Sequence, residues 1–377
     1  MKLAFFTLNA YDMLSGGHHK AAAGGAQAQQ ILIARELAKK GHDVYFIEYD
    51  QPYKKSKKID GIHIFTKPKP DNSAVSRGLT ATYGTFKILN KLKPDICYRR
   101  VLDFEIILLA IYSSISKCKF VYSVAHDDEL TANPHIFAHS KLKSTSMYHR
   151  MNRWALSRAD AVIVQHEDQL ELARKSLKTD VQMIYNSYPI RNTHPIEWDI
   201  PSPVVLWAAE FRKLKRAHMV PAIARLMPNV QFLMAGGPGD KKLYEDIRKS
   251  SKDLDNLKML GHIPFEDIDR YFTAADIFLN TSKSEGFPNT FLQAWAAEIP
   301  VVSAEVNPHN LLSKKEIGLV GDGSVESVVH NLSYILENRA TKEKIVKNAV
   351  QRLIDNHSVN AAVNQYEALF SGLVDGN

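Results

Sequence analysis

Cysteine and long hydrophobic runs are what this sequence of 377 residues has least of. Its 2 cysteines, Cys97 and Cys118, are too few for a disulfide framework and lack the spacing of a zinc site, which is typical of a reducing cytoplasm. No apolar run reaches about 18 residues, so we expect no membrane-spanning helix. Residues 1–9 have neither a basic region nor a small-residue cleavage site, and we interpret them as a first β-strand and not as a secretion signal.

Acidic residues are outnumbered by basic ones, with 41 Asp and Glu against 48 Lys and Arg and a formal net charge of +7. This excess favours anionic partners, namely nucleotide phosphates, a lipid surface or a nucleic acid. The sequence has neither zinc-finger spacing nor an aromatic RNA-binding motif, so we expect no nucleic-acid partner.

Strand-like and helix-like segments alternate along the chain. Residues 3–8 and 44–47 are short apolar runs separated by a helical pattern over residues 27–40, and the alternation restarts at residues 204–209. It predicts an α/β fold with two Rossmann-like, doubly wound domains, each a parallel sheet covered by helices. Ligands of such domains lie outside the carboxyl ends of the strands, so we expect the active site in a cleft between the domains.

Four prolines interrupt the periodicity over residues 188–203. We therefore predict an N-terminal domain over residues 1–190, a linker over residues 191–203 and a C-terminal domain over residues 204–356. A last helical segment follows within residues 357–377.

A polar loop with the sequence SEGFPNT, residues 284–290, lies between a predicted buried strand at residues 277–281 and a largely apolar helix. The free backbone N–H groups of Asn289 and Thr290 at the start of that helix would form an anion site suited to a diphosphate. An ordinary strand–loop–helix corner with an N-cap accounts for the same residues equally well, so the chemistry alone leaves both interpretations open.

Two polar side chains flank this helix start, Glu285 and, eight residues later, Gln293. A carboxylate accepts hydrogen bonds from sugar hydroxyls, and a Gln amide both donates to and accepts from a ribose. One loop–helix unit could thus hold sugar, phosphates and ribose in order.

Residues 272–303, around this loop, resemble glycosyltransferase family 4. The resemblance implies the GT-B fold and a reaction that retains the anomeric configuration. The family's hallmark is a pair of glutamates with seven residues between them; here the first is Glu285, whereas the second position holds Gln293. A neutral ribose contact is compatible with Gln293, and a role that needs negative charge is not. Glu298 stands where many members have glycine, which we interpret as a tolerated change at a helix end.

The resemblance implies roles for residues in other loops. Lys215 matches a lysine that neutralises the departing diphosphate, and Arg212 would substitute for an arginine whose usual place is taken by Glu210. His262 lies in the turn that meets the nucleobase, and His126 matches a histidine that contacts the transferred sugar across the cleft.

The glycine-rich loop after the first strand is expected to face donor and acceptor, with Gly17 and Gly25 as the candidate contacts. It is not an ordered GxGxxG motif, so we infer no NAD. The last helix is expected to pack back on the N-terminal domain. The predicted catalytic residues are therefore His126, Glu285, Lys215 and Arg212, and the predicted donor-binding residues are Gly17, Gly25, His262, Phe287, Asn289, Thr290 and Gln293.

Two DxD pairs, Asp253 with Asp255 and Asp267 with Asp269, have the spacing of metal-dependent transferases of another fold. The second pair lies in a predicted amphipathic helix, and we expect both pairs to face solvent. We predict no metal site and no cofactor beyond the nucleotide sugar itself, because family members use a helix N-terminus and basic residues in place of a metal.

Residues 130–159 contain no Asp or Glu, and their basic residues alternate with Met147, Met151 and Trp154. Lys54 and Lys55 begin a second basic run. Such a segment can lie on anionic lipid, although an ordinary solvated helix face has the same pattern. We expect peripheral attachment to the inner face of the plasma membrane.

The sequence thus predicts a cytoplasmic, retaining and metal-independent glycosyltransferase. Its donor would be a nucleotide-diphosphate sugar, with UDP favoured, and its acceptor a glycan or a polyprenyl-diphosphate-linked glycan in surface polysaccharide synthesis. Two alternatives remain: a nucleotide-sugar 2-epimerase on the same fold, and a catalytically degenerate scaffold subunit that binds nucleotide sugar.

Overall fold

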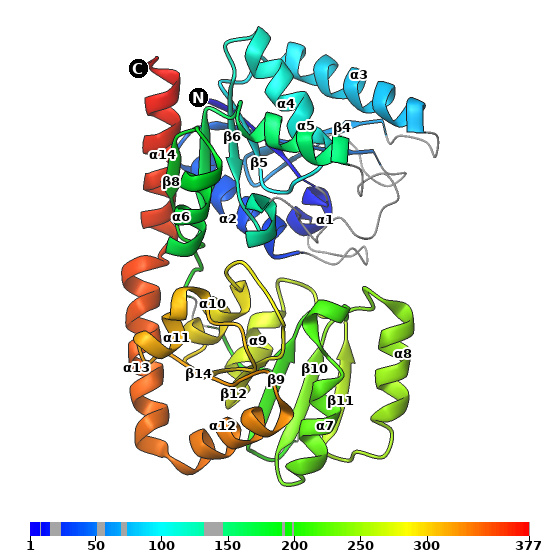
Figure 1. Cartoon of the computed structure of the whole chain (residues 1–377), viewed down its shortest axis with the longest axis vertical. Helices are drawn as coiled ribbons and strands as arrows, with labels where there is room; N and C mark the ends of the chain where they lie inside the picture. Colours follow the sequence, from blue (N-terminus) through cyan, green and yellow to red (C-terminus); the bar gives the residue numbers. More distant parts are fainter. Residues whose placement is uncertain are drawn as a thin grey trace. The chain divides into compact units, whose positions relative to one another are not determined.

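The computed structural model describes residues 1–7, 9–15, 24–50, 57–68, 74–131, 146–190, 193–197 and 200–376. The chain divides into two compact units, shown in Figure 1: unit 1 comprises Met1–Asn186 and Val359–Asn377, and unit 2 comprises Ser187–Ser358. Each unit is a largely parallel sheet covered by helices, so the predicted α/β fold class with two doubly wound domains is confirmed. The residues 191–203 that the proline pattern marks as a linker fall within unit 2.

The sheet of unit 1 has eight strands in the order β3-β4-β2-β1-β5-β6-β7-β8. All neighbouring strands are parallel except β3 and β4. The strands are β1 (Lys2–Phe6), β2 (Asp43–Tyr49), β3 (Lys57–Ile59), β4 (Ile62–Lys67), β5 (Ile96–Arg99), β6 (Lys119–Ser123), β7 (Ala161–Val164) and β8 (Val181–Met183). Strand β7, which has a neighbour on each side, is apolar throughout and buried, as expected where helices cover both faces of a parallel sheet.

The helices of unit 1 are α1 (Ala10–Leu14), α2 (Gly25–Lys39), α3 (Ala74–Leu92), α4 (Phe104–Ile115), the 3₁₀ turn η1 (Asp127–Leu130), α5 (Ser146–Leu156), α6 (Glu167–Ser176) and α14 (Val359–Val374). Although α14 is the last helix of the chain, it packs against α2. The hydroxyls of Tyr98 and Tyr366 are 3.2 Å apart, and Glu367 accepts from His42 at 2.8 Å. These contacts make the C-terminal helix part of unit 1.

The sheet of unit 2 has six parallel strands in the order β11-β10-β9-β12-β13-β14. They are β9 (Val204–Ala208), β10 (Gln231–Ala235), β11 (Leu257–Gly261), β12 (Ile277–Asn280), β13 (Val301–Ser303) and β14 (Leu319–Val320). The helices are η3 (Lys213–Lys215), α7 (Met219–Leu226), α8 (Lys241–Ser250), α9 (Ile268–Thr273), α10 (Asn289–Ala296), η4 (Pro308–Asn310), α11 (Leu311–Lys314), α12 (Val325–Glu337) and α13 (Arg339–Asn356).

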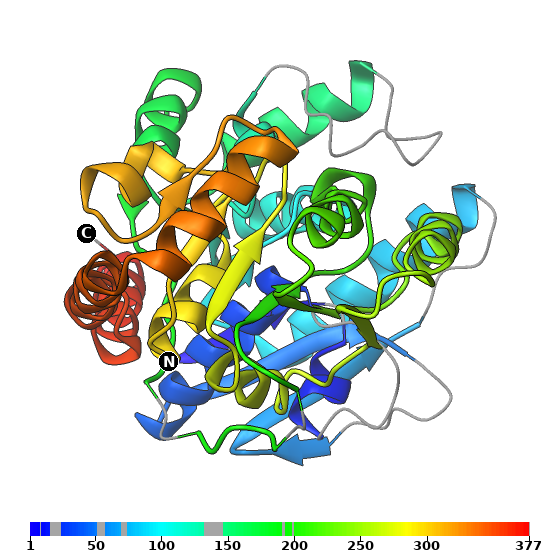
Figure 2. The same cartoon turned by 90° about the horizontal axis from the view of Figure 1, so that it is seen from below.

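Successive residues of β9 face two separate cores. Val204 and Leu206 pack with residues of α9, α10 and α13, whereas Val205 and Trp207 pack with residues of α7 and α12. Figure 2 shows helices on both sides of these strands. The alternation buries both faces of the sheet and leaves the ends of the strands as the place for a ligand.

The strand order of unit 2 reverses at β9. The chain proceeds from β9 to β10 and β11 on one side, then returns to place β12 against the other side of β9. Between β9 and β12 lies the topological switch point, where ligands of open α/β sheets bind at the carboxyl ends of the strands. The loops that follow β9 and β12 carry Lys215 and Glu285, so the fold brings these two motifs to one place.

The two ends of unit 2 meet in the structure. The backbone N–H of Tyr188 donates to the carbonyl oxygen of His357 at 3.0 Å. His357 is fully buried and its ring lies 5.0 Å from that of Phe287. This junction therefore joins the two ends of the unit, one residue inside each, to the base of the Glu285 loop.

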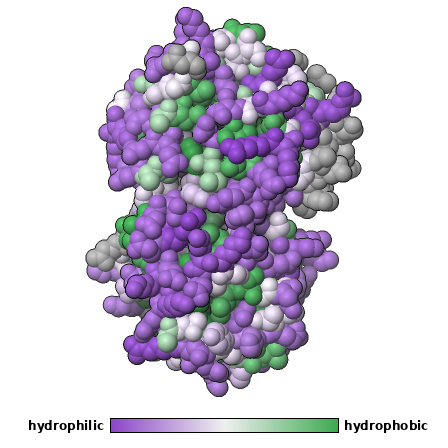
Figure 3. Space-filling model, turned by 60° about the vertical axis from the view of Figure 1, so that its left-hand side comes forward, coloured by the Kyte–Doolittle hydropathy of each residue, from purple (hydrophilic) through white to green (hydrophobic). Residues whose placement is uncertain are grey.

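Some large hydrophobic side chains of the described residues are exposed, among them Tyr83, Ile115 and Leu226. The face drawn in Figure 3 is mostly hydrophilic, and its hydrophobic side chains form small patches between polar ones. Of the helices in the described parts of the chain, none has both the length and the apolar character needed to cross a membrane.

Candidate functional site

Lys215 and Glu285 meet at the switch point of unit 2. The Lys215 Nζ donates to Oε1 of Glu285, and the Ser282 hydroxyl donates to the same oxygen at 2.7 Å. The Lys215 and Glu285 side chains are 24% and 17% exposed, so the pair is shielded but reachable by a ligand. The structure thus joins the basic loop of Lys215 to the loop of Glu285, which follows 70 residues later in the sequence.

Further hydrogen bonds tie the two loops together. The Thr281 hydroxyl donates to the carbonyl oxygen of Lys215 at 2.7 Å and accepts from the indole N–H of Trp207 at 2.8 Å. The backbone N–H of Lys283 donates to the carbonyl oxygen of Leu214 at 2.9 Å. Because these bonds are mostly buried, they fix the distance between the lysine and the glutamate.

Arg216 also belongs to this site, although no motif in the sequence marks it. Its Nε and Nη2 donate to the carbonyl oxygens of Thr281 and Ser282 at 2.8 and 3.1 Å, and its Nη1 lies 3.0 Å from a carboxylate oxygen of Glu305. Its backbone is left-handed, with φ 45°. The guanidinium therefore holds the strand end that precedes Glu285, a role that no spacing in the sequence indicates, because its partners are backbone carbonyls.

Arg212 does not join the Lys215–Glu285 pair. Its Nη2 lies 2.5 Å from Oε2 of Glu210, and its side chain is 64% exposed. The arginine is thus paired with the glutamate that stands at the position of the family's arginine. Its predicted contact with a diphosphate would require this exposed ion pair to open.

The start of α10 lies beside the Glu285 loop. Pro288 is its N-cap residue and offers no side-chain hydrogen bond to the first turn. Asn289 and Thr290 are the first two residues of the helix and are half-buried. The positive end of the helix dipole therefore faces the same loop as Lys215, as an anion site requires.

Phe287, predicted as a donor-binding residue, has its ring in the core. It is 6% exposed and lies 6.2 Å from the ring of Trp295 and 5.0 Å from that of His357. Burial of this apolar ring stabilises the loop from the core side.

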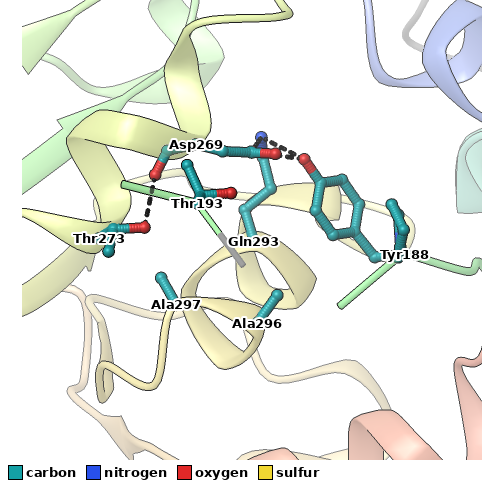
Figure 4. Close-up of a pocket in the computed structure, with 8 residues that line it drawn as sticks. Tyr188, Thr193, Asp269, Thr273, Gln293, Ala296 and Ala297 are labelled. Carbon is teal, nitrogen blue, oxygen red and sulfur yellow. Dashed lines mark hydrogen bonds between the residues drawn. The ribbon is translucent and has the colours of Figure 1, made fainter. Parts of the chain in front are cut away.

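Gln293 is buried within α10 and lies beside Asp269 of α9. Its Nε2 donates to the Tyr188 hydroxyl and to Oδ1 of Asp269, both at 3.2 Å, and Tyr188 donates to that same Oδ1 at 2.6 Å (Figure 4). The expectation that both carboxylates of the second DxD pair face solvent is therefore wrong for Asp269. Amphipathic periodicity shows which face of a helix is polar and does not show that other polar side chains pack against it.

His262 follows β11 and is exposed. It stands beside the glycine turn after β10, where Gly236 donates its N–H to the carbonyl oxygen of Gly261 at 2.7 Å. A Cβ at Gly236 would lie 1.8 Å from the carbonyl oxygen of Ala209, so only glycine allows the loops after β9 and β10 to approach this closely.

In unit 1, His126 follows β6 and its side chain is 18% exposed. The backbone N–H of Asp128 donates to its Nδ1 at 3.4 Å. The adjacent Asp127 accepts from His166 Nε2 at 3.1 Å and from Gln169 Nε2 at 2.7 Å. Burial opposes ionisation of Asp127, but these hydrogen bonds outweigh that effect and lower the pKa of Asp127 below its ordinary value.

Glu129 lies beneath the same turn and is buried. It accepts from the Tyr122 hydroxyl at 2.8 Å and from the backbone N–H of Ala125 at 2.9 Å. Burial raises the pKa of Glu129 to about 7, although both hydrogen bonds act in the opposite direction.

Gly25 is the first residue of α2, and Gly17 lies outside the described residues.

Two sequence profiles cover most of the chain. The profile described as Glycosyltransferase Family 4 matches residues 23–190, and the one described as Glycosyl transferases group 1 matches residues 193–352. The chain belongs to glycosyltransferase family 4. The resemblance that the Glu285 loop predicts is thereby confirmed, and it extends over both units.

Curated relatives of this family 4 glycosyltransferase match it at low identity. The lipopolysaccharide core biosynthesis glycosyltransferase LpsE of Rhizobium meliloti is 28% identical over 174 residues, which are 45% of this chain and 50% of that protein. The N-acetyl-alpha-D-glucosaminyl L-malate synthase of Bacillus anthracis is 19% identical over 92% of this chain and 93% of its own length. The match to LpsE spans about half of that relative.

Solved structures share the fold of the family 4 chain over its whole length. Sucrose-phosphate synthase from Thermosynechococcus elongatus superposes with a TM-score of 0.83 at 15% identity, covering 100% of both chains. HepE of Anabaena, solved with UDP-glucose, superposes with a TM-score of 0.76 at 17% identity, covering 99% of this chain and 100% of its own. The predicted GT-B fold is confirmed.

Glu298 departs from the family's glycine at the end of α10. Its φ is 58°, a left-handed conformation that glycine adopts without strain and a glutamate does not. The side chain is exposed, so the position retains its backbone geometry although the residue has changed.

Among the described residues of this glycosyltransferase, no group of three His, Cys, Asp or Glu side chains lies close enough to hold a metal ion. Lys215 and the start of α10 bring positive charge to the switch point.

Proposed function

We propose that this family 4 glycosyltransferase is a retaining, metal-independent enzyme that uses a UDP-sugar. Its acceptor is a glycan or a polyprenyl-diphosphate-linked glycan of a surface polysaccharide. The single observation that carries the proposal is the contact between Lys215 and Glu285 beside the start of α10. A cation, a carboxylate and a helix N-terminus at one switch point suit a sugar attached to a diphosphate.

The names of relatives support the donor and the acceptor. HepE of Anabaena is solved with UDP-glucose. An Escherichia coli relative, 25% identical over 159 residues, is named UDP-Gal:alpha-D-GlcNAc-diphosphoundecaprenol alpha-1,3-galactosyltransferase. Together with LpsE, these names favour a UDP-sugar and a surface-glycan acceptor for this chain.

The chemistry we propose breaks the bond between the anomeric carbon and the diphosphate oxygen. The acceptor hydroxyl oxygen forms the new bond on the same face, and its proton passes to an oxygen of the departing phosphate. Lys215 and the N–H groups of Asn289 and Thr290 stabilise the charge on that diphosphate. Glu285 accepts hydrogen bonds from the hydroxyls of the transferred sugar.

Other residues have supporting roles in the proposal. Gln293 contacts the ribose, and backbone groups near His262 contact the nucleobase. Arg212 assists Lys215 once its exposed ion pair with Glu210 opens. His126 of unit 1 contacts the transferred sugar, an assignment that depends on the family resemblance.

A donor screen followed by a transfer assay tests the proposal. UDP-sugars should raise the melting temperature of the protein more than GDP-, ADP- or CMP-sugars do, because ligand that binds the folded state stabilises it. Lys215→Ala and Glu285→Ala should each abolish most of the transfer to a polyprenyl-diphosphate glycan acceptor. Lys213→Ala is the matched control, because Lys213 is an exposed lysine of the same loop.

The same assay separates the alternatives. Conversion of the UDP-sugar to its 2-epimer without acceptor would identify an epimerase. Donor binding without any turnover would identify a scaffold subunit. Stabilisation by no nucleotide sugar would refute the proposed donor site.

Membrane attachment is part of the proposal. On α5, Arg150 and Arg153 are exposed, and the side chains of Met151 and Trp154 are 37% and 40% exposed. Just after the helix, the Arg158 guanidinium lies 5.9 Å from the centre of the Trp154 ring. Basic and aromatic side chains on one helix suit an anionic lipid surface at the inner face of the plasma membrane. Flotation with anionic liposomes at low salt should carry the protein upward, and Trp154→Ala with Arg153→Glu should abolish this. The basic residues Lys54 and Lys55 lie outside the described residues.

A further inference from the structure

A small pocket of unit 2 contains the polar triad of Tyr188, Asp269 and Gln293. Its other lining residues are Pro189, Thr193, Thr273, Ala296 and Ala297 (Figure 4). The triad comes from three segments, namely the start of the unit, the first turn of α9 and the second turn of α10. Tyr188 and Gln293 are 6% and 7% exposed, so their hydrogen bonds form largely away from water.

The triad fixes which way the Gln293 amide faces. A carboxylate can only accept hydrogen bonds, so the side of the amide next to Asp269 must be the NH₂ group. This group donates to Asp269 Oδ1 and to the Tyr188 hydroxyl, each at 3.2 Å. Tyr188 uses its own proton in the 2.6 Å bond to Asp269, which leaves its oxygen to accept from Gln293. The Oε1 of Gln293 therefore lies on the side of the amide that turns away from Asp269.

Asp269 also explains why position 293 does not hold the family's glutamate. A glutamate there would place a second carboxylate about where the amide now stands, 3.2 Å from Asp269 Oδ1. Two carboxylates at that distance cannot both remain ionised without a strong penalty. In this chain the negative charge is that of Asp269 on α9, and the residue on α10 is a neutral donor to it.

We infer that Asp269 is a positioning residue of the donor site, which orients the Gln293 amide so that its Oε1 accepts a hydrogen bond from a ribose hydroxyl of the nucleotide. This inference rests on the proposed function, because a ribose reaches Gln293 only if the diphosphate binds beside Lys215. Asp269 acts through Gln293, and Tyr188 completes the same arrangement from the start of the unit.

Reversing the donor and the acceptor of this hydrogen bond tests the inference. In Gln293→Glu, two carboxylates face each other, and the affinity for UDP should fall at least about tenfold, the value of one net hydrogen bond of about 1.4 kcal/mol. In the double variant Asp269→Asn with Gln293→Glu, the Asn amide donates to the new carboxylate. This variant should recover UDP affinity to within about threefold of wild type.

The readout specific to ribose is the comparison of UDP with 2′-deoxy-UDP and 3′-deoxy-UDP by titration calorimetry on the full chain. Wild type should bind at least one deoxy analogue about tenfold more weakly than UDP, because the analogue lacks the hydroxyl that Gln293 accepts from. Asp269→Ala should lose this discrimination, because the remaining partner, the Tyr188 hydroxyl, can donate or accept and so does not hold the amide in one orientation. A merely structural role for Asp269 would lower the melting temperature and leave the discrimination intact.

Asp267→Asn is the matched control, since Asp267 is an exposed carboxylate next to the same helix, and it should behave as wild type. Retention of full UDP affinity by Gln293→Glu, or a double variant no better than that single one, would overturn the inference while leaving the proposed function in place. Unchanged discrimination in Asp269→Ala would do the same. Absence of UDP binding by wild type would overturn both.

Discussion

Lys215 donates a hydrogen bond to Glu285 across 70 residues of sequence, at the point where the strand order of unit 2 reverses. Each residue compensates the charge of the other, and the Ser282 hydroxyl shares the carboxylate oxygen. Both side chains are therefore ordered before a substrate arrives, which reduces the entropy lost when they bind it.

Substitution of Glu285 should lower the turnover rate without weakening nucleotide binding. In Glu285→Gln the shape of the side chain is kept while the ion pair is lost, so Lys215 is free to bind the diphosphate. We expect transfer to fall about 100-fold, as when a polar group that acts on a transition state is removed, with UDP affinity equal to or above that of wild type. Initial rates and calorimetry check this, and equal losses in both would show that Glu285 only supports the loop.

Removal of the Arg216 side chain should destabilise the protein. Arg216→Ala leaves the buried carbonyls of Thr281 and Ser282 without their cationic donor, at a cost of about 2 to 3 kcal/mol in the free energy of unfolding. Arg216→Gly should cost about 1 kcal/mol less, because glycine accepts φ 45° without strain. Urea denaturation measures the stability of both variants. Arg339→Ala is the control, because the Arg339 side chain is 91% exposed. Identical losses for the two variants would contradict the role assigned to the backbone.

Glycine at position 298 should stabilise the protein. Glu298 ends α10 with φ 58° and an exposed side chain, so Glu298→Gly removes backbone strain without removing a buried contact. We expect about 1 kcal/mol of added stability, seen as a higher melting temperature. Glu298→Ala keeps the strain and should bring no gain. A gain of the same size from alanine would show that the charge of Glu298 matters and not its conformation.

The buried carboxyl of Glu129 should make stability depend on pH. Its pKa is raised by burial from 4.5 to about 7, so between these values the folded state holds a proton that the unfolded state has lost. This contribution to stability is present below pH 4.5 and is lost as pH rises through about 7. The loss is on the order of 3 kcal/mol. Glu129→Gln should flatten this part of the profile, measured as the free energy of unfolding between pH 5 and pH 8. A slope that persists in the variant would assign it to another group.

The sequence was sufficient for the fold and for the family because both depend on local periodicity and on one contiguous motif. Strands such as β9 and β12 follow from short apolar runs, and the Glu285 loop between a strand and a helix carries the family resemblance. The basic loop with Lys215 was found for the same reason, since it directly follows a strand. Such features are encoded by neighbours in the chain.

The partners of these side chains could not be predicted, because they come from distant segments. Asp269 was expected in solvent, yet Tyr188 and Gln293 pack against it. Arg212 was expected at the diphosphate, whereas an ion pair with Glu210 holds it. The ring of Phe287 was placed at the ligand and lies in the core, because its contact with His357 depends on how the end of α13 returns. Pairing of this kind is decided by tertiary packing and leaves no mark on residue spacing.

The hydrogen bond between Tyr188 and His357 has a consequence for how this protein could be divided. Since the chain enters and leaves unit 2 at bonded neighbours, that unit is topologically an insertion whose two ends already touch. Residues 187–358 could be excised as a closed piece with the Lys215–Glu285 pair and the Asp269 triad intact. Unit 1 could be rejoined by a short linker from residue 186 to residue 359.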